Sequence, residues 1–225
     1  MAEFDRYAND YSGLLDESLA LVGGFSDYYS RQKVALLEGV VKEIKTRSVM
    51  DFGCGIGGTT LMLSRAFPSA RVVGVDISEV SIEEARRKND KIEFGCISDE
   101  VFMGTVGSFD LIYVANVFHH IPLSERTRVV GTLKSLLSPG GKIFVFEHNP
   151  YNPVTKWIVS RCEFDRDANL LSPRESRQLF VASGFRVARP MYLLFFPHTL
   201  KFLSKLDMAL KWLPIGAQYC VTASL

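Results

Sequence analysis

Hydrophobic positions between residues 46 and 147 follow two alternating spacings. Short runs of adjacent apolar residues alternate with longer stretches in which apolar residues recur every three or four positions. The first spacing predicts buried strands, and the second predicts helices that pack by one face. The runs predict strands at 49–52, 72–75, 92–96, 110–115 and 143–146. The stretches predict helices at 59–67, 78–89 and 124–137, preceded by a helix whose inner face carries Val34, Leu37, Val41 and Ile44.

This alternation predicts a parallel, doubly wound sheet, because each strand is followed by a helix that returns the chain to the same edge. Ligands of such sheets bind beyond the carboxyl ends of the strands. The polar residues and glycines at these ends are therefore the first candidates for a functional site: Asp51, Gly53, Asp76, Ser98, Asp99, Asn116 and Glu147.

The last third of the chain follows a different pattern. A polar connection over 148–171, with a short helix near 155–161, leads to the capping box Ser172-Pro173-Arg174-Glu175 and a helix that ends at Gly184. Extended segments are expected at 185–187 and 192–196, an amphipathic helix at 199–213 and a final strand at 217–223. We expect the last two strands to form an antiparallel pair at one edge.

Together these elements predict an α/β, Rossmann-like, doubly wound sheet of seven strands, mostly parallel with an antiparallel C-terminal edge strand. A chain of 225 residues with 47% hydrophobic residues fits one such domain. We divide it into an N-terminal lid and helical segment (1–45), a cofactor-binding core (46–147) and a substrate-side insertion with the C-terminal strands (148–225).

Charge and cysteine content exclude several classes of protein. A net charge of +1 without a basic stripe argues against nucleic acid as a partner. The four cysteines are scattered without a CxxC pair, which argues against a zinc site and a disulfide framework and favours a reducing cytoplasm. The start of the chain is acidic and polar, unlike a secretory signal. No apolar run reaches the about 18 residues that a membrane-spanning helix needs.

The strongest motif is the glycine turn that follows the first strand. Gly53, Gly55 and Gly58 satisfy the GxGxxG pattern, and Asp76 ends the next strand about 20 residues later. Glycines let the backbone pass close to a nucleoside, and the helix N-terminus offers free N–H groups. An acidic side chain at this distance holds ribose hydroxyls. The pattern predicts an adenosine-type cofactor and, taken alone, also fits a dinucleotide.

Three further features favour a cofactor that carries an amino acid. Asp51, two residues before the first glycine, would repel a pyrophosphate but attract an ammonium group. The fourth strand continues from Asn116 into Val117-Phe118-His119-His120-Ile121. Leu137-Ser138-Pro139-Gly140-Gly141-Lys142 precedes the fifth strand.

In this order, the motifs of residues 4–147 resemble those of the class I S-adenosylmethionine-dependent methyltransferases, especially the branch with quinone-biosynthesis and other small-molecule enzymes. The resemblance implies S-adenosylmethionine as the cofactor. Asp51, Gly53, Gly55 and Gly57 would surround its methionine part, and Asn116 would lie where the methyl group is delivered. Asp76 would bind the ribose and Ile77 would pack on the adenine.

The resemblance also assigns residues at the adenine and over the cofactor. An aspartate of the family meets the adenine amino group near position 98, where this chain has Ser98 followed by Asp99. The aromatic N-terminal segment of the family often covers the cofactor, which would give Tyr7 and Tyr11 a lid role.

Methyl transfer needs a general base only when the acceptor must lose a proton. Candidates at the carboxyl edge are His119, His120, Glu147 and His148, and no metal ligand set is expected. Each candidate also has a purely structural interpretation. His119 or His120 would be a packed residue or one bonded to the backbone, Glu147 would anchor its loop, and His148 would be an ordinary loop residue. Asp76 and Asp51 have equivalent alternatives as a helix-cap carboxylate and a turn-stabilising residue.

The apolar C-terminal third favours a partly apolar small-molecule acceptor, such as a quinone, polyketide, lipid or glycoconjugate. The lysine-rich face of 199–213 leaves two interpretations, a packed surface helix or a weak contact with lipid or a membrane surface. A non-catalytic S-adenosylmethionine-binding regulatory protein and an NAD-dependent oxidoreductase remain as alternative functions. The pattern favours no particular oligomeric state.

Overall fold

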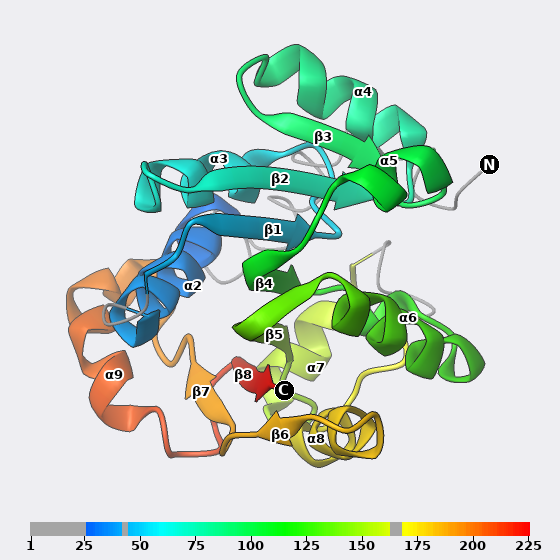
Figure 1. The fold of residues 1–225 in the computed structure, drawn as a ribbon. Helices are drawn as coiled ribbons and strands as arrows, with labels where there is room; N and C mark the ends of the chain where they lie inside the picture. The colour runs from blue at the N-terminus through cyan, green and yellow to red at the C-terminus, as the bar shows by residue number, and fades with distance from the viewer. Residues whose placement is uncertain (1–25, 42–44, 163–167) are drawn as a thin grey trace.

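The fold was examined in a computed structural model, which describes residues 26–41, 45–162 and 168–225 (Figure 1). The proposed lid residues Tyr7 and Tyr11 lie outside the described residues. No helix within these ranges combines the length and the apolar character needed to cross a membrane.

An eight-stranded sheet forms the centre of the molecule, in the order β3-β2-β1-β4-β5-β8-β6, with β7 also paired to β8. The first five strands are parallel to one another. Their bounds are Ser48–Phe52 (β1), Arg71–Asp76 (β2), Glu93–Cys96 (β3), Phe109–Ala115 (β4) and Leu137–His148 (β5). The chain therefore brings Asp51, Asp76, Asn116 and Glu147 to one edge of the sheet, as the alternating pattern predicts.

The C-terminal strand β8 (Gln218–Ser224) runs antiparallel to β5, with Glu147 opposite Tyr219 and His148 opposite Gln218. The short strands β6 (Arg186–Val187) and β7 (Met191–Leu193) pair with the outer side of β8. The Rossmann-like fold class is thus confirmed, with a mostly parallel sheet and an antiparallel C-terminal strand. The sheet has eight strands and not the predicted seven, because residues 186–187 and residues 191–193 form two separate strands that each pair with β8.

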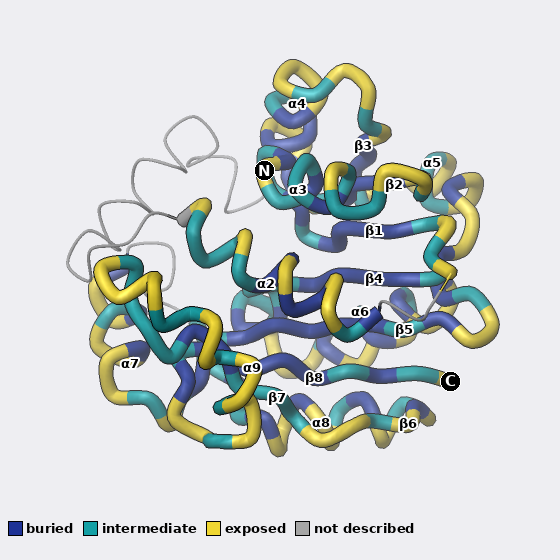
Figure 2. Tube along the Cα trace, turned by 90° about the vertical axis from the view of Figure 1, so that its left-hand side faces the viewer, coloured by how far each residue is buried: buried dark blue, intermediate teal, exposed yellow. Residues whose placement is uncertain are grey.

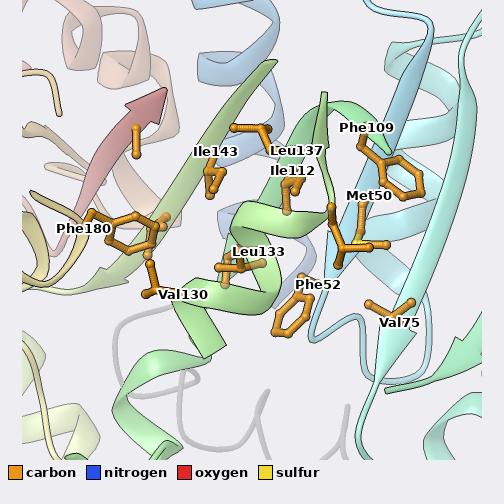
Figure 3. Close-up of a cluster of buried hydrophobic side chains, with 14 of the residues drawn as sticks. Met50, Phe52, Val75, Phe109, Ile112, Val130, Leu133, Leu137, Ile143 and Phe180 are labelled. Carbon is orange, nitrogen blue, oxygen red and sulfur yellow. The ribbon is translucent and has the colours of Figure 1, made fainter. Parts of the chain in front are cut away.

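Helices cover both faces of the sheet. Alternate residues of β1 point to opposite faces, so Met50 and Phe52 join one hydrophobic cluster and Val49 joins another. Helices α6 (Leu123–Ser135) and α8 (Pro173–Ala182) pack on the first cluster, which Figure 3 shows around Met50, Leu133 and Phe180. Helices α2 (Ser26–Val41) and α3 (Gly58–Ala66) pack on the second.

Further helical elements follow β2, β3, β4 and β5 along the chain. They are α4 (Glu79–Lys88), α5 (Glu100–Thr105), α7 (Pro153–Val159) and the 3-10 turn η2 (Phe118–His120). Ser78 caps α4, because its side chain accepts a hydrogen bond from the backbone N–H of Ser81 at 3.1 Å. The predicted helix at 124–137 ends at Ser135, and the residues of the Ser-Pro-Gly-Gly turn belong to the start of β5.

The amphipathic helix predicted at 199–213 is wrong. The structure has a 3-10 segment η4 (His198–Leu206), in which Leu200 is not helical, followed by the single turn α9 (Asp207–Leu210). Neither element contains a buried residue. Helices draw most of their stability from packing an apolar face. The apolar residues of 199–213 lack such a contact, so burial of an apolar face does not stabilise one regular helix here.

The capping box before α8 gives a direct test of the local sequence signal. Ser172 Oγ accepts from the Glu175 N–H at 3.2 Å, and a Glu175 carboxylate oxygen accepts from the Ser172 N–H at 2.7 Å. We predict that Ser172→Ala lowers the free energy of unfolding by about 1 kcal/mol, because a helix N–H loses its acceptor. Denaturant unfolding measures this, with exposed Ser69→Ala as the matched control. An equal effect of both variants would contradict a specific capping role.

Candidate functional site

The glycine turn joins β1 to α3 and lies against β2 and the loop that follows β4. Gly53, Gly55 and Gly57 all have positive φ, at 82°, 52° and 81°. The N–H groups of Gly53 and Cys54 donate to the Val75 carbonyl at 2.7 and 3.0 Å. A Cβ on Gly53 would collide with the side chain of Val117, whereas no atom lies within 4 Å of the Cβ position of Gly55. The turn is therefore packed at Gly53 and open at Gly55.

Asp76 at the end of β2 supports this turn directly. Its Oδ2 accepts from the Gly55 N–H at 2.8 Å, and its Oδ1 accepts from the Ser78 N–H at 2.9 Å. The helix cap itself is Ser78, so Asp76 is not the capping residue of α4. The next side chain, Ile77, is exposed, which is unusual for isoleucine and fits its predicted place against a ring of the cofactor.

Ser98 and Asp99 follow β3 at the same edge. Asp99 is the N-cap of α5, and its Oδ1 accepts from the Phe102 N–H at 3.0 Å. Ser98 Oγ lies 3.0 Å from the thiol of Cys96. Capping occupies one carboxylate oxygen of Asp99. The groups that remain available for the predicted contact with adenine are Ser98 and the second carboxylate oxygen of Asp99.

Asp51 is buried on the face of the sheet that α2 and α3 cover. Its Oδ2 accepts from the Thr60 hydroxyl at 2.7 Å. The pKa of Asp51 is raised to about 7, because burial and the nearby Asp76 raise it more than the Thr60 hydrogen bond and Lys33 lower it. A buried carboxylate with a raised pKa marks a place where a cation would be favourable.

Lys33 on α2 brings the opposite charge to this region. It is only 5% exposed, and burial lowers its pKa to about 8 although the negative charges of Glu147 and Asp51 raise it. Buried lysines are rare unless they have a partner or a task. The motif analysis missed Lys33, yet a signal was present, because this lysine continues the apolar stripe of Leu37 and Val41 at four-residue spacing.

Glu147 at the end of β5 is fully buried and holds the loop after β4. Its Oε1 accepts from the N–H groups of Val117 and Phe118 at 3.0 and 2.7 Å, and its Oε2 lies 2.5 Å from His119 Nδ1. Burial alone would raise the pKa of Glu147, but His119, His148 and the backbone donor lower it below its ordinary value. This geometry favours the interpretation of Glu147 as an anchor of the loop. His119, which contacts Glu147, is only 2% exposed.

A second polar group lies where β4, β5 and β8 meet. The side-chain amide of Gln218 donates to Asn116 Oδ1 at 3.0 Å and lies 3.4 Å from His148 Nδ1. Asn116 adopts a positive φ of 57°, a conformation that asparagine tolerates better than most residues. Within the described residues, the buried Gln218 Oε1 has no hydrogen-bond partner. Sequence reasoning missed Gln218 because only its register opposite His148 brings it to the site.

These residues fit the cofactor that the motifs imply. Gly55 leaves open space at the turn, Asp76 and exposed Ile77 end β2, and buried Asp51 and Lys33 offer one group of each charge to an amino acid moiety. The described residues hold no cluster of three or more histidine, cysteine, aspartate or glutamate side chains suited to a metal ion. The fold is Rossmann-like, and the candidate site at its carboxyl edge would suit a nucleoside cofactor that carries an amino acid group.

Comparisons with known proteins identify the class more closely. Residues 49–141 match the family model described as "Methyltransferase domain". A trans-aconitate 2-methyltransferase from Methylobacterium radiotolerans is 32% identical over 132 residues, which cover 59% of this chain and 49% of that protein. A ubiquinone biosynthesis O-methyltransferase from Coxiella burnetii is 31% identical over 151 residues, 64% of this chain and 59% of that protein.

The fold has matching solved structures. An O-methyltransferase family protein from Burkholderia thailandensis superposes with a TM-score of 0.68 at 15% identity, covering 97% of this chain and 61% of the other. This chain spans about half the length of the curated relatives that it matches. The resemblance drawn from the motifs is confirmed over residues 49–141, which match a methyltransferase domain, and a match of this kind supports S-adenosylmethionine as the cofactor.

The raised pKa of Asp51 predicts a pH-dependent stability. Between its ordinary pKa near 4 and its folded value of about 7, the folded protein binds this proton more tightly than the unfolded chain. The free energy of unfolding therefore falls as the pH rises through this window, by a few kcal/mol in order of magnitude. Asp51→Asn removes this contribution. Denaturant unfolding between pH 4.5 and pH 8 should show the variant gaining stability relative to the wild type, whereas parallel profiles would contradict the raised pKa.

Proposed function

We propose that this chain transfers a methyl group from S-adenosylmethionine to a partly apolar small-molecule acceptor. The observation that carries the proposal is the arrangement of Asn116, His148 and Gln218 at the carboxyl edge, directly beside the glycine turn. The similar relatives are named for different acceptors, so the choice of acceptor rests on this chain's own residues.

The residues on the cofactor side of the site bind S-adenosylmethionine and orient it. Bound S-adenosylmethionine supplies a methyl group on a sulfonium, which is a good leaving group. Asp51 offers a carboxylate to the ammonium group, Lys33 offers a cation to the carboxylate, and Asp76 offers its carboxylate to the ribose. Holding a reactant in one orientation is itself a large part of catalysis for a displacement of this kind.

The acceptor side combines polar atoms with an apolar wall. Gln218 Oε1 provides a buried acceptor of hydrogen bonds, and Asn116 and His148 flank it. Gln218 pairs with Leu193 of β7, and the chain continues into Leu194 and the half-exposed Phe195 and Phe196. This mixture suits a ring or chain that carries one polar group to be methylated, as in a quinone, polyketide, lipid or glycoconjugate.

His148 is the general base that the geometry favours when the acceptor must lose a proton. It is half-exposed, whereas His119 and Glu147 are buried and bonded to each other. We assign His119 and Glu147 the role of positioning residues, because they hold the loop that carries Asn116 and contact the His148 ring, whose centroid lies 5.1 Å from that of His119.

Cofactor binding is the first test. We expect calorimetry to show binding of S-adenosylmethionine and S-adenosylhomocysteine, and we expect Asp76→Ala to weaken it at least about tenfold, because charged hydrogen bonds to the ribose and the support of Gly55 are lost. Asp90→Ala, an exposed residue of the same kind, is the control. Binding of NAD in place of both compounds would support the oxidoreductase alternative and overturn the proposal.

Catalysis separates an enzyme from a regulatory binding protein. With an acceptor found by screening partly apolar phenols and quinols, we expect His148→Ala to lower kcat by about 10²–10⁴ with a smaller change in KM. His198→Ala serves as the control histidine. An unchanged kcat would exclude His148 as the base, and a binding-competent protein without turnover on any acceptor would favour the regulatory alternative.

A further inference from the structure

Nine of the fifteen exposed large apolar side chains of the described residues lie in two segments, 151–157 and 200–215. The side chains of Phe202, Trp212 and Tyr151 are 72%, 71% and 62% exposed. Val154, Trp157 and Ile215 are also exposed. We call these six residues the apolar patch. Clustered exposed aromatic side chains of this size mark an interaction surface rather than ordinary surface variation.

Hydrogen bonds join the first segment to the C-terminal end of the second. The side-chain amide of Asn152 donates to the Ile215 carbonyl at 2.7 Å, and the Thr155 hydroxyl donates to the Ala217 carbonyl at 2.9 Å. Figure 2 shows the exposed turns of α7 and α9 at the same end of the molecule, where the parallel strands finish. The patch is thus fixed to the framework on the side of the candidate site.

Positive charge accompanies the patch although the whole chain carries a net charge of only +1. The two segments and their immediate neighbours contain exposed basic residues at Lys156, Arg161, Lys201, Lys205 and Lys211. Among the described residues of the two segments Asp207 is the one acidic residue, and its Oδ2 faces inward to accept from the Leu194 N–H at 3.2 Å, whereas Glu163, Asp165 and Asp167 follow Arg161 in the sequence. The guanidinium of Arg161 stacks 4.4 Å from the ring centroid of Trp157. A basic residue also directly precedes each of Trp157, Phe202 and Trp212 in the sequence: Lys156, Lys201 and Lys211.

We propose that the apolar patch docks this protein onto the surface of an anionic phospholipid bilayer. Aromatic side chains are favoured at the level of the headgroups, and lysine and arginine near the surface add about 1 kcal/mol each through attraction to anionic lipids. The irregular segment 198–210 has no buried side chain, so its apolar residues are available to a lipid surface. This docking needs no methyl transfer and stands apart from the proposed function.

The patch also lies close to the acceptor side of the site. Asn149, the residue after His148, donates through its side-chain amide to the carbonyls of Pro214 and Gly216 at 3.1 and 2.8 Å. These hydrogen bonds join the end of β5 to the chain beside Trp212 and Ile215. A protein docked by the patch would thus hold the carboxyl edge of its sheet near the bilayer, where apolar molecules partition.

Tryptophan fluorescence tests this docking directly, because the chain has only two tryptophans, Trp157 and Trp212, and both belong to the patch. We expect the emission of the full chain to shift to shorter wavelength when vesicles of phosphatidylcholine with about one quarter phosphatidylglycerol are added at low salt. Salt near 0.5 M should reduce the shift, because it screens the attraction. Vesicles of phosphatidylcholine alone should produce a much smaller shift.

A pair of charge-reversal variants provides the matched control. We expect Lys201→Glu with Lys205→Glu to weaken vesicle binding at least about tenfold. Lys45→Glu with Lys91→Glu changes the net charge equally at the opposite end of the sheet and should leave binding within about twofold. Asp76→Ala should dock normally while losing cofactor binding, so failure of docking is distinguishable from failure of the proposed function.

Three results would overturn the proposal. The first is an emission maximum that vesicles leave unchanged, and the second is an equal shift with neutral and anionic vesicles. The third is a shift that grows with protein concentration in the absence of lipid and coincides with a dimer in sedimentation, which would assign the patch to a second copy of this chain.

Discussion

The carboxyl edge of the sheet depends on the buried carboxylate of Glu147. One oxygen accepts from the backbone of Val117 and Phe118, and the other meets His119. A buried charge is tolerated only when its hydrogen bonds are made, so these contacts fix the loop after β4 to the end of β5. Val117 in turn packs so close to Gly53 that no side chain fits there. The anchor at Glu147 therefore sets the shape of the glycine turn across two neighbouring strands.

The same edge concentrates charges in a way that suits one kind of ligand. The negative charge of Asp76 disfavours the ionisation of buried Asp51, and Lys33 only partly offsets this. A ligand with a positive amino group and a sulfonium would relieve the repulsion, whereas a pyrophosphate would increase it. The electrostatics thus distinguish between the two cofactor classes that the glycine pattern alone leaves open.

Most of the fold could be predicted from the sequence because its signals are local. The alternation of strand and helix spacings, the cap at Ser78 and the capping box at Ser172 each depend on residues within one element. Gln218 could not be assigned to the site in this way, because its place depends on antiparallel pairing with His148 across 70 residues. Lys33 likewise gains its meaning only when α2 packs over Asp51 and Glu147.

The segment at 198–210 shows the limit of periodicity as a predictor. Its apolar spacing is that of an amphipathic helix, but spacing only states which residues share a face and not whether another surface covers that face. Here Leu203 and Leu210 are only partly buried, Phe202 and Leu206 stay exposed, and the segment forms a 3-10 turn and one helical turn instead. An apolar stripe that the fold leaves exposed costs solubility without adding to the core. Exposed Phe202, Leu206 and Met208 lie in the same segment as exposed Lys201 and Lys205, which is the combination that the proposed contact with an anionic lipid surface would use.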